Sequence, residues 1–282
     1  IKTSFTGEDE LSVAIDSGST TAGPVDEFGL NNTADALKVD GVAYKFPIGD
    51  SITAMFADNK DAATLFTVAC AYGGPSDTLD DCGNVNANID NAGVTAMAEY
   101  DFDNGFTAAV GYAGNETGIM TDEGIDAYAA NVAYTGDNFG ISATYGNIES
   151  TAIVAAGEVD TYVALNAYYT FDNGMSISGG YEIGTKQNVS QYADETTAYF
   201  VGVEGEVGPG TLGAAFGTQG AIQEEYVSGG TSKTEEDMMY EAYYSYDVND
   251  GMTITPLVYI KEGTSTGDAD ETGLMVKTSF SF

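Results

Sequence analysis

An alternation of apolar residues with polar or small ones runs through this chain from end to end, and it restricts the fold more than any other feature. In the segment 92–102, one face carries Val94, Ala96, Ala98, Tyr100 and Phe102, and the other carries Thr95, Met97, Glu99 and Asp101. Successive side chains of a strand point to opposite faces, so a period of two predicts strands. Helical periodicity is not evident anywhere, and an all-β fold is expected.

Fifteen segments carry this alternation and are predicted to be strands. They are 1–6, 10–17, 36–46, 51–58, 92–102, 105–114, 125–135, 138–148, 159–171, 174–184, 196–207, 211–219, 237–248, 251–261 and 271–282. The connections between them alternate strictly between short and long. That rhythm places all tight turns at one end of the sheet and all long loops at the other, as in an outer-membrane barrel with short periplasmic turns.

Two of the tight turns have the same sequence. Asp103-Asn104-Gly105 lies in YDFDNGFTAAVGY, and Asp172-Asn173-Gly174 lies in YTFDNGMSISGGY. Asn and Gly tolerate the positive φ that hairpin turns need, so each copy is predicted to be a β-hairpin. The apolar rows end in Tyr or Phe beside the turns, which is typical of the aromatic residues at a membrane interface.

Periodicity alone fits both a soluble sandwich, with its apolar face inward, and a membrane barrel, with its apolar face outward. Strands of about ten residues match a tilted membrane span. Together with the aromatic ends, they favour a single transmembrane up-and-down β-barrel domain over residues 1–282. A soluble β-sandwich and a plugged barrel remain as alternatives.

The composition excludes several function classes. Among 282 residues, 44 are acidic and 8 basic, giving a formal charge of −36. Nucleic acid and anionic membrane surfaces would be repelled by that charge. There is no run of 18 apolar residues for a transmembrane helix. Histidine is absent, so the usual base of a hydrolytic site is missing, and no enzymatic activity is expected.

Two cysteines, Cys70 and Cys82, lie in the Gly-, Pro- and Asp-containing stretch CAYGGPSDTLDDC. With no histidine and no third cysteine, a zinc site lacks ligands. A disulfide within the long loop 59–91 is predicted, and two free thiols are the alternative. Whether this loop folds into the barrel is left open. Its Asp and Asn oxygens would suit Ca²⁺, but the spacing matches no recognised calcium loop, and otherwise no cofactor is expected.

If the apolar rows face lipid, the opposite rows face a wet pore. The predicted pore-lining residues are Glu99, Asp101, Asp126, Asp160, Glu182, Glu204, Glu206, Glu241, Asp247, Lys261 and Lys277. A low-dielectric wall strengthens the field of such charges, so a weak preference for cations is expected. Tyr162, Tyr168 and Tyr243 would be either a stacking surface for sugars or simple wall filler.

The stretch TSFTGEDEL, from Thr3 to Leu11, resembles a signature of cyanobacterial outer-membrane porins that are related to carbohydrate-selective porins and often labelled iron-uptake porins. The Gly73-Gly74-Pro75 stretch, the FDNG hairpins and the terminal Phe282 agree with it. The resemblance implies sixteen strands, a homotrimer and passage of small solutes or ions. It also implies an upstream surface-layer-homology domain that binds a cell-wall polymer. Glu8 replaces the usual lysine, so the role of that cation does not carry over.

The expected function is therefore a passive diffusion channel of the bacterial outer membrane, in contact with its lipid, and the alternative is a structural or adhesive surface β-protein. Fifteen is an odd number, whereas single-chain bacterial barrels have an even number of strands. Segments 1–6 and 271–282 both run toward the short-turn end. An opposing strand is therefore expected before Ile1, unless 63–72 hides the sixteenth.

Overall fold

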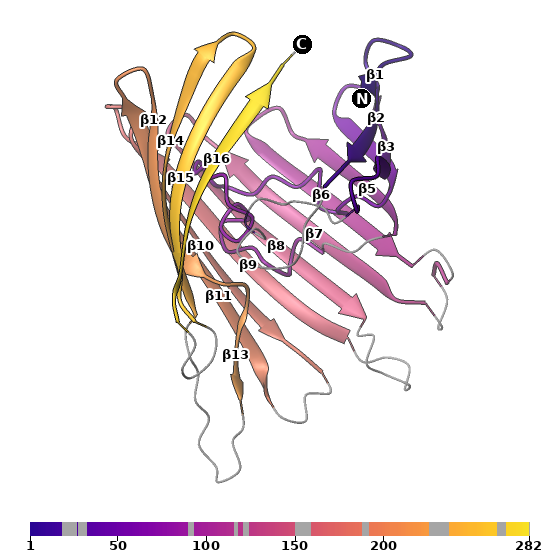
Figure 1. Ribbon diagram of the computed structural model, residues 1–282. Coiled ribbons are helices and arrows are strands. Elements are labelled where there is room, and N and C mark those ends of the chain that lie inside the picture. The colour runs from indigo at the N-terminus through magenta and orange to yellow at the C-terminus, as the bar shows by residue number, and fades with distance from the viewer. Residues whose placement is uncertain are drawn as a thin grey trace.

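The computed structural model is a curved antiparallel sheet that wraps around a central space (Figure 1). It describes residues 1–18, 27, 33–89, 93–115, 118–120, 124–149, 159–187, 192–225, 237–263 and 269–281. Fifteen strands follow one another as hydrogen-bonded neighbours in chain order, and β13 pairs with β11 off this path. No helix within these ranges is long and apolar enough to cross a membrane.

The strands have the following bounds: β1 Lys2–Thr3, β2 Glu10–Asp16, β3 Lys38–Ile48, β4 Ile52–Asp58, β5 Val94–Asp101, β6 Phe106–Gly114, β7 Asp126–Thr135, β8 Phe139–Glu149, β9 Val159–Thr170, β10 Ser176–Thr185, β11 Tyr192–Val207, β12 Gly210–Thr218, β13 Ile222–Glu225, β14 Met238–Asn249, β15 Met252–Lys261 and β16 Glu271–Phe280. All fifteen predicted strands are confirmed, with ends that differ by a few residues. The prediction missed β13, which continues β12 beyond a bend at Gly220, a residue with φ of +73°.

The two faces of the sheet differ in the way a membrane barrel requires. On the outer face, Ile141, Leu165 and Val132 expose about half of their surface, at 52%, 56% and 57%. On the inner face of the same strands, Ser142 and Asn166 are buried. Apolar residues therefore face outward and polar residues inward, the reverse of a soluble β-sandwich.

The repeated FDNG sequence gives a tight hairpin turn twice, with the glycine in the same conformation, although Asp103 has a positive φ and Asp172 does not. Gly105 and Gly174 have φ of +86° and +81°, which only glycine adopts at little cost. In each turn the asparagine side chain accepts the amide two residues on, from Phe106 to Asn104 Oδ1 at 3.2 Å and from Met175 to Asn173 Oδ1 at 3.1 Å. Both copies are hairpins at the short-turn end, as predicted.

The TSFTGEDEL stretch owes its shape to one carboxylate. Asp9 Oδ1 accepts the Ser4 hydroxyl at 2.7 Å and the Thr6 amide at 2.8 Å, and Tyr44 of β3 donates to Oδ2 at 2.7 Å. These donors hold the pKa of Asp9 well below its usual range. The signature therefore encodes a rigid turn that is fixed to the neighbouring strand.

The sheet path ends at β1 and at β16, which border an opening in Figure 1. Within the described residues, β1 pairs only with β2 and β16 only with β15. Residues 59–89 contain no strand. Direct pairing of β1 with β16, or a strand within the long loop 59–91, would have contradicted a strand before Ile1. Neither is seen in the described part of the chain, and a strand before Ile1 stays a prediction. Phe282 lies outside the described residues.

Candidate functional site: the barrel interior and its inner loop

The connection between β4 and β5 folds into the barrel instead of projecting from its rim (Figure 1). Its described part, residues 59–89, is called the inner loop here. Several of its residues are almost completely buried although none belongs to a strand, among them Ala62, Leu79, Asn84, Ala87 and Ile89. The question that the sequence left open about this loop is thereby answered.

The first limb of the inner loop crosses the inner wall in an extended conformation. The amides of Thr67, Ala69, Ala71 and Gly73 donate in turn to Asn131 of β7, Ser142 of β8, Ser178 of β10 and Glu204 of β11. Six extended residues span about 20 Å, and four strand spacings span about 19 Å. The loop backbone therefore runs across the strands, and side chains of the wall supply its hydrogen-bond acceptors.

The second limb returns along the same wall. Glu182 of β10, only 1% exposed, accepts the amides of Asn86 and Ala87 and the Asn86 side-chain amide, all at 2.8 Å. Asn166 of β9 donates to the Cys82 carbonyl at 2.9 Å. These bonds satisfy loop groups that burial would otherwise leave without partners.

Inward-facing glycines make room for this packing. A Cβ added to Gly180 of β10 would lie 1.8 Å from the Cys82 carbonyl oxygen. At Gly111 of β6 it would lie 2.2 Å from the Ala62 carbonyl oxygen, and at Gly146 of β8 it would lie 2.9 Å from Ala87 Cα. The loop backbone thus occupies the space that side chains at these positions would take.

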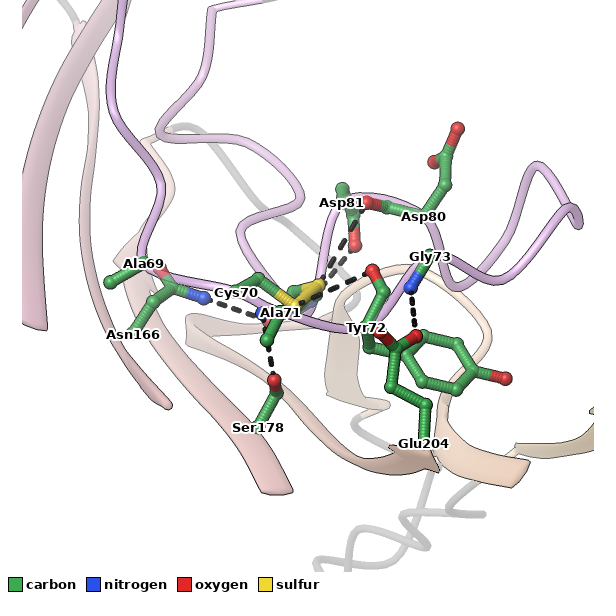
Figure 2. Close-up of a disulfide and its surroundings, with 12 residues drawn as sticks. Ala69, Cys70, Ala71, Tyr72, Gly73, Asp80, Asp81, Asn166, Ser178 and Glu204 are labelled. Atoms are coloured by element: carbon green, nitrogen blue, oxygen red, sulfur yellow. Dashed lines mark hydrogen bonds between the residues drawn. A yellow bond between two sulfur atoms is a disulfide. The ribbon is translucent and has the colours of Figure 1, made fainter. Parts of the chain in front are cut away.

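The disulfide Cys70–Cys82 joins the two limbs, with Cα atoms 6.4 Å apart. The predicted bond is present. Figure 2 shows it between the Ala71–Ser178 and Gly73–Glu204 contacts on one limb and the Asn166 contact on the other. The bond therefore connects two segments that the wall already anchors separately.

The turn of the inner loop reaches further around the barrel. Tyr72 donates to Glu241 of β14 at 2.7 Å, and burial beside that carboxylate raises the pKa of Tyr72. Glu27, which comes from the β2–β3 connection and is 2% exposed, accepts the Thr78 hydroxyl at 2.6 Å. It also forms an ion pair with Lys261 of β15. These contacts tie the loop to strands on the far side of the curved sheet.

Two carboxyls of the loop turn have raised pKa values because protein atoms surround them, although Asp80 is still exposed at the loop surface and Asp81 is half-buried. Burial and the neighbouring charge of Asp77 raise the pKa of Asp80 to about 6, against the opposing effect of Lys277. Burial raises the pKa of Asp81 to about 7, although the Gly83 amide, which donates to Asp81 Oδ1 at 2.9 Å, opposes the shift. Each group is therefore partly protonated near neutral pH.

Ten of the eleven predicted pore residues lie on the inward-facing rows, but they do not all meet an open passage. Glu182, Glu204 and Glu241 hold the inner loop, and Lys261 holds Glu27. The remaining six have inner-face positions outside these anchoring contacts: Glu99, Asp101, Asp160, Glu206, Asp247 and Lys277.

The prediction that Asp126 lines the pore is wrong. It belongs to the row of β7 that carries the outward-facing Tyr128 and Val132, and it accepts the hydroxyl of Tyr112, an outward residue of β6, at 2.7 Å. It lies at the first residue of β7, where the long connection ends, and alternation counted from mid-strand would have placed it on the lipid-facing side.

An open hollow of about 590 Å³ remains between β2–β4 and the start of the inner loop. Its charged lining residues are Lys2, Lys45, Lys60, Glu10, Asp40 and Asp61. The charges of three basic and three acidic side chains therefore balance in this hollow, whereas the whole chain has 44 acidic and 8 basic residues. Sequence reasoning missed these lysines, although Lys45 shares an inward row with Ala43 and Gly41, a signal that was present.

The aromatic side chains suggested for sugars do not form an exposed surface. Tyr162 and Tyr243 are buried, at 3% and 4% exposure. Tyr243 packs edge-on against Tyr72, with ring centroids 5.5 Å apart, beneath the inner loop. In the described residues, no group of three acidic or cysteine side chains is placed to hold a metal ion, and the calcium hypothesis stays an untested prediction.

Comparison with known proteins shows the fold and no closer relationship. A triple mutant of the Rhodopseudomonas blastica porin superposes with a TM-score of 0.56 at 13% identity, over 100% of this chain and 87% of that one. A loop L8 deletion mutant of OmpT, an outer membrane protein of Vibrio cholerae, gives 0.64 at 11%, over 96% and 89%. This chain has a porin-type barrel fold.

No family model and no curated protein matches the sequence. The fold therefore supports the resemblance to outer-membrane porins in general. The more specific resemblance, to the cyanobacterial family with a surface-layer-homology domain, has no support from these comparisons.

Proposed function

We propose that this chain is a passive diffusion channel of the bacterial outer membrane that passes small solutes and ions. One observation carries the proposal: the backbone of the inner loop is hydrogen-bonded across the inner wall from β7 to β11, and a charged hollow remains beside the loop. The apolar outer face supports a membrane location. The inner loop would narrow the passage, and the hollow beside β2–β4 would be the route for solutes.

The proposed selectivity is a weak preference for cations. The hollow itself carries balanced charge, so the preference would come from inward acids elsewhere along the wall, such as Glu206 and Asp247. Both are exposed. Salt screens exposed charges strongly, and therefore the preference should be modest and should weaken as ionic strength rises.

Homotrimer formation, cyanobacterial membership and attachment to a cell-wall polymer rest on the TSFTGEDEL resemblance alone. They stay part of the proposal and no contact in the structure bears on them.

Conductance across a planar lipid bilayer tests the function. Purified protein in detergent should insert and give discrete steps, and reversal potentials in a KCl gradient should indicate cation preference. A barrel that inserts but conducts no ions would favour the alternative, a structural or adhesive surface protein. The buried inner loop gives that alternative its one specific argument, since a filled barrel needs no passage.

A further inference from the structure

A hollow on the outer face of the sheet is not used by the proposed channel. It has a volume of about 640 Å³ and crosses the neighbouring strands β6 to β11. Its exposed apolar lining includes Phe106, Val132, Ile141, Leu165, Tyr181 and Val201. No residue of the inner loop lines it, although that loop covers the inner face of the same strands, so the hollow opens outward.

The floor of the hollow follows one row of directly paired residues across β8 to β11: Ile141, Ala167, Gly179 and Val201. Ala167 and Gly179 are the small members of this row. The adjacent rows on β9 and β10 carry Tyr169 and Ile177 on one side, and Leu165 and Tyr181 on the other. The hollow is therefore a groove with small residues between two raised rows, and the sheet hydrogen bonds hold it open without a ligand.

The groove rises from the short-turn end of the barrel toward mid-height. Phe106 is the first residue of β6, directly after a tight turn, whereas Val201 lies six positions (207 − 201) before the end of β11 at Val207. Six residues of a strand tilted by about 40° rise roughly 15 Å, about half of the hydrocarbon thickness. At its lower end Phe106 and Tyr134 pack together, with ring centroids 4.7 Å apart, as at a membrane interface.

We propose that this groove holds one acyl chain of a phospholipid from the leaflet next to the short turns. The proposal rests on the proposed function only for the membrane location of the barrel. The groove is continuous with the lipid-facing surface, and none of its lining residues is charged. A hydrocarbon chain is narrow and apolar, and the exposed lining of the groove is made of apolar and aromatic side chains. A second copy of the chain would present a broad face, which fills such a groove poorly.

Two variants separate filling of the groove from a general change of the outer face. At Gly179, an added Cβ would have only the Phe200 carbonyl oxygen within 4 Å, at 3.7 Å, so Gly179→Leu fills the groove without displacing the backbone. Ala130→Leu adds the same side chain to an exposed outward position of β7 that does not line the groove. Native mass spectrometry of detergent-purified protein should show one retained phospholipid per chain for wild type and Ala130→Leu, and none for Gly179→Leu.

The absence of tryptophan from the chain permits an optical test. Tyr181 borders the groove, and Tyr145 lies outside it at nearly equal exposure, 45% and 46%. Tyr181→Trp and Tyr145→Trp are reconstituted with phosphatidylcholine brominated on its acyl chains, then diluted into excess detergent. Fluorescence quenching should persist at least twofold more in Tyr181→Trp. Equal loss of quenching, or equal lipid retention by all variants, overturns the proposal.

Two further measurements, cross-linking of oligomers and conductance, distinguish the lipid groove from an interface between copies and from the channel function. If Gly179→Leu disrupts a cross-linked oligomer and no lipid is retained by wild type, the groove is an interface between copies and the proposal is wrong. Conductance of the same preparations reports on the channel function alone. Because the groove faces outward, lipid retention in a barrel that does not conduct would support the groove and refute the channel.

Discussion

The inner wall of β7–β11 and the inner wall of β2–β4 belong to one sheet and have opposite roles. The first is covered by the inner loop, and its polar side chains accept loop amides. The second faces an open hollow, and of its charged side chains within the described residues only Asp40 accepts a hydrogen bond from the inner loop, from the Asn59 side-chain amide at the start of that loop. Inward polarity therefore has two uses, to bind a backbone segment or to face water. Which use applies depends on where a distant loop lies.

Glu182 gives the largest expected effect on this difference. Glu182→Ala removes the acceptor of one buried and two part-buried donors and should cost about 3 kcal/mol of docking free energy, because donors left without partners inside a protein are expensive. The second limb should detach, and single-channel conductance should increase. Glu206→Ala, a change on an exposed inward acid, is the matched control and should leave conductance almost unchanged. Unaltered conductance and stability in Glu182→Ala would mean that the two walls do not differ as described.

Removal of the disulfide gives the second-largest expected effect. Cys70→Ser with Cys82→Ser should lower the stability of the docked loop by roughly 3 kcal/mol, the entropy of closing a loop of this size. We expect larger fluctuations of the open-channel current with the barrel still folded, since no strand is cross-linked. Mass spectrometry without reduction should first show the Cys70–Cys82 peptides two mass units below the dithiol. Alkylation of both thiols in native protein would remove the basis of this prediction.

Adjacent glycines on β10 compare the inner and outer faces of a single strand. Gly180→Ala places its Cβ against the Cys82 carbonyl and should cost about 1–3 kcal/mol through overpacking. Gly179→Ala faces outward into free space and should be near neutral. Thermal unfolding in detergent measures both. A smaller cost for Gly180→Ala than for Gly179→Ala would show that the loop is not packed on this wall.

The pH dependence of loop docking follows from Asp80 and Asp81. Their pKa values are raised in the folded protein to about 6 and about 7, so the folded state binds more protons than the unfolded state between the ordinary carboxyl range and pH 7. Docking should therefore strengthen as pH falls from 8 to 6 and weaken as it rises. Limited proteolysis of the loop across this range measures it, with Asp81→Asn as the control that flattens the profile.

The smallest expected effect concerns selectivity. Replacing Glu206 and Asp247 by Gln and Asn should reduce the K⁺/Cl⁻ permeability ratio by roughly twofold, because both acids are exposed and screened by salt. Lys45→Gln should raise the ratio, since Lys45 lines the hollow. Reversal potentials measure both. An unchanged ratio in Lys45→Gln would place the route for ions somewhere other than beside β2–β4.

The alternation of side chains was sufficient to predict the strands, their order and the orientation of most rows. A strand has only two faces, so local sequence determines which residues share one. The FDNG turns were predictable for the same reason, because positive φ is a local requirement. Asp126 was placed wrongly because its row was not counted from mid-strand, where alternation from Val132 and Tyr128 puts it on the outward-facing side.

The inner loop could not be predicted from alternation, since its hydrogen bonds join residues far apart in the chain, such as Gly73 with Glu204 and Asn86 with Glu182. The sequence by itself determined that Glu182, Glu204 and Glu241 point inward. Only the tertiary structure decided that they accept donors from the loop while Lys45 faces a hollow. The physical reason is that burial and hydrogen-bonding partners are set by what packs against a face, and here a segment 95 to 169 residues away in the sequence packs against these glutamates.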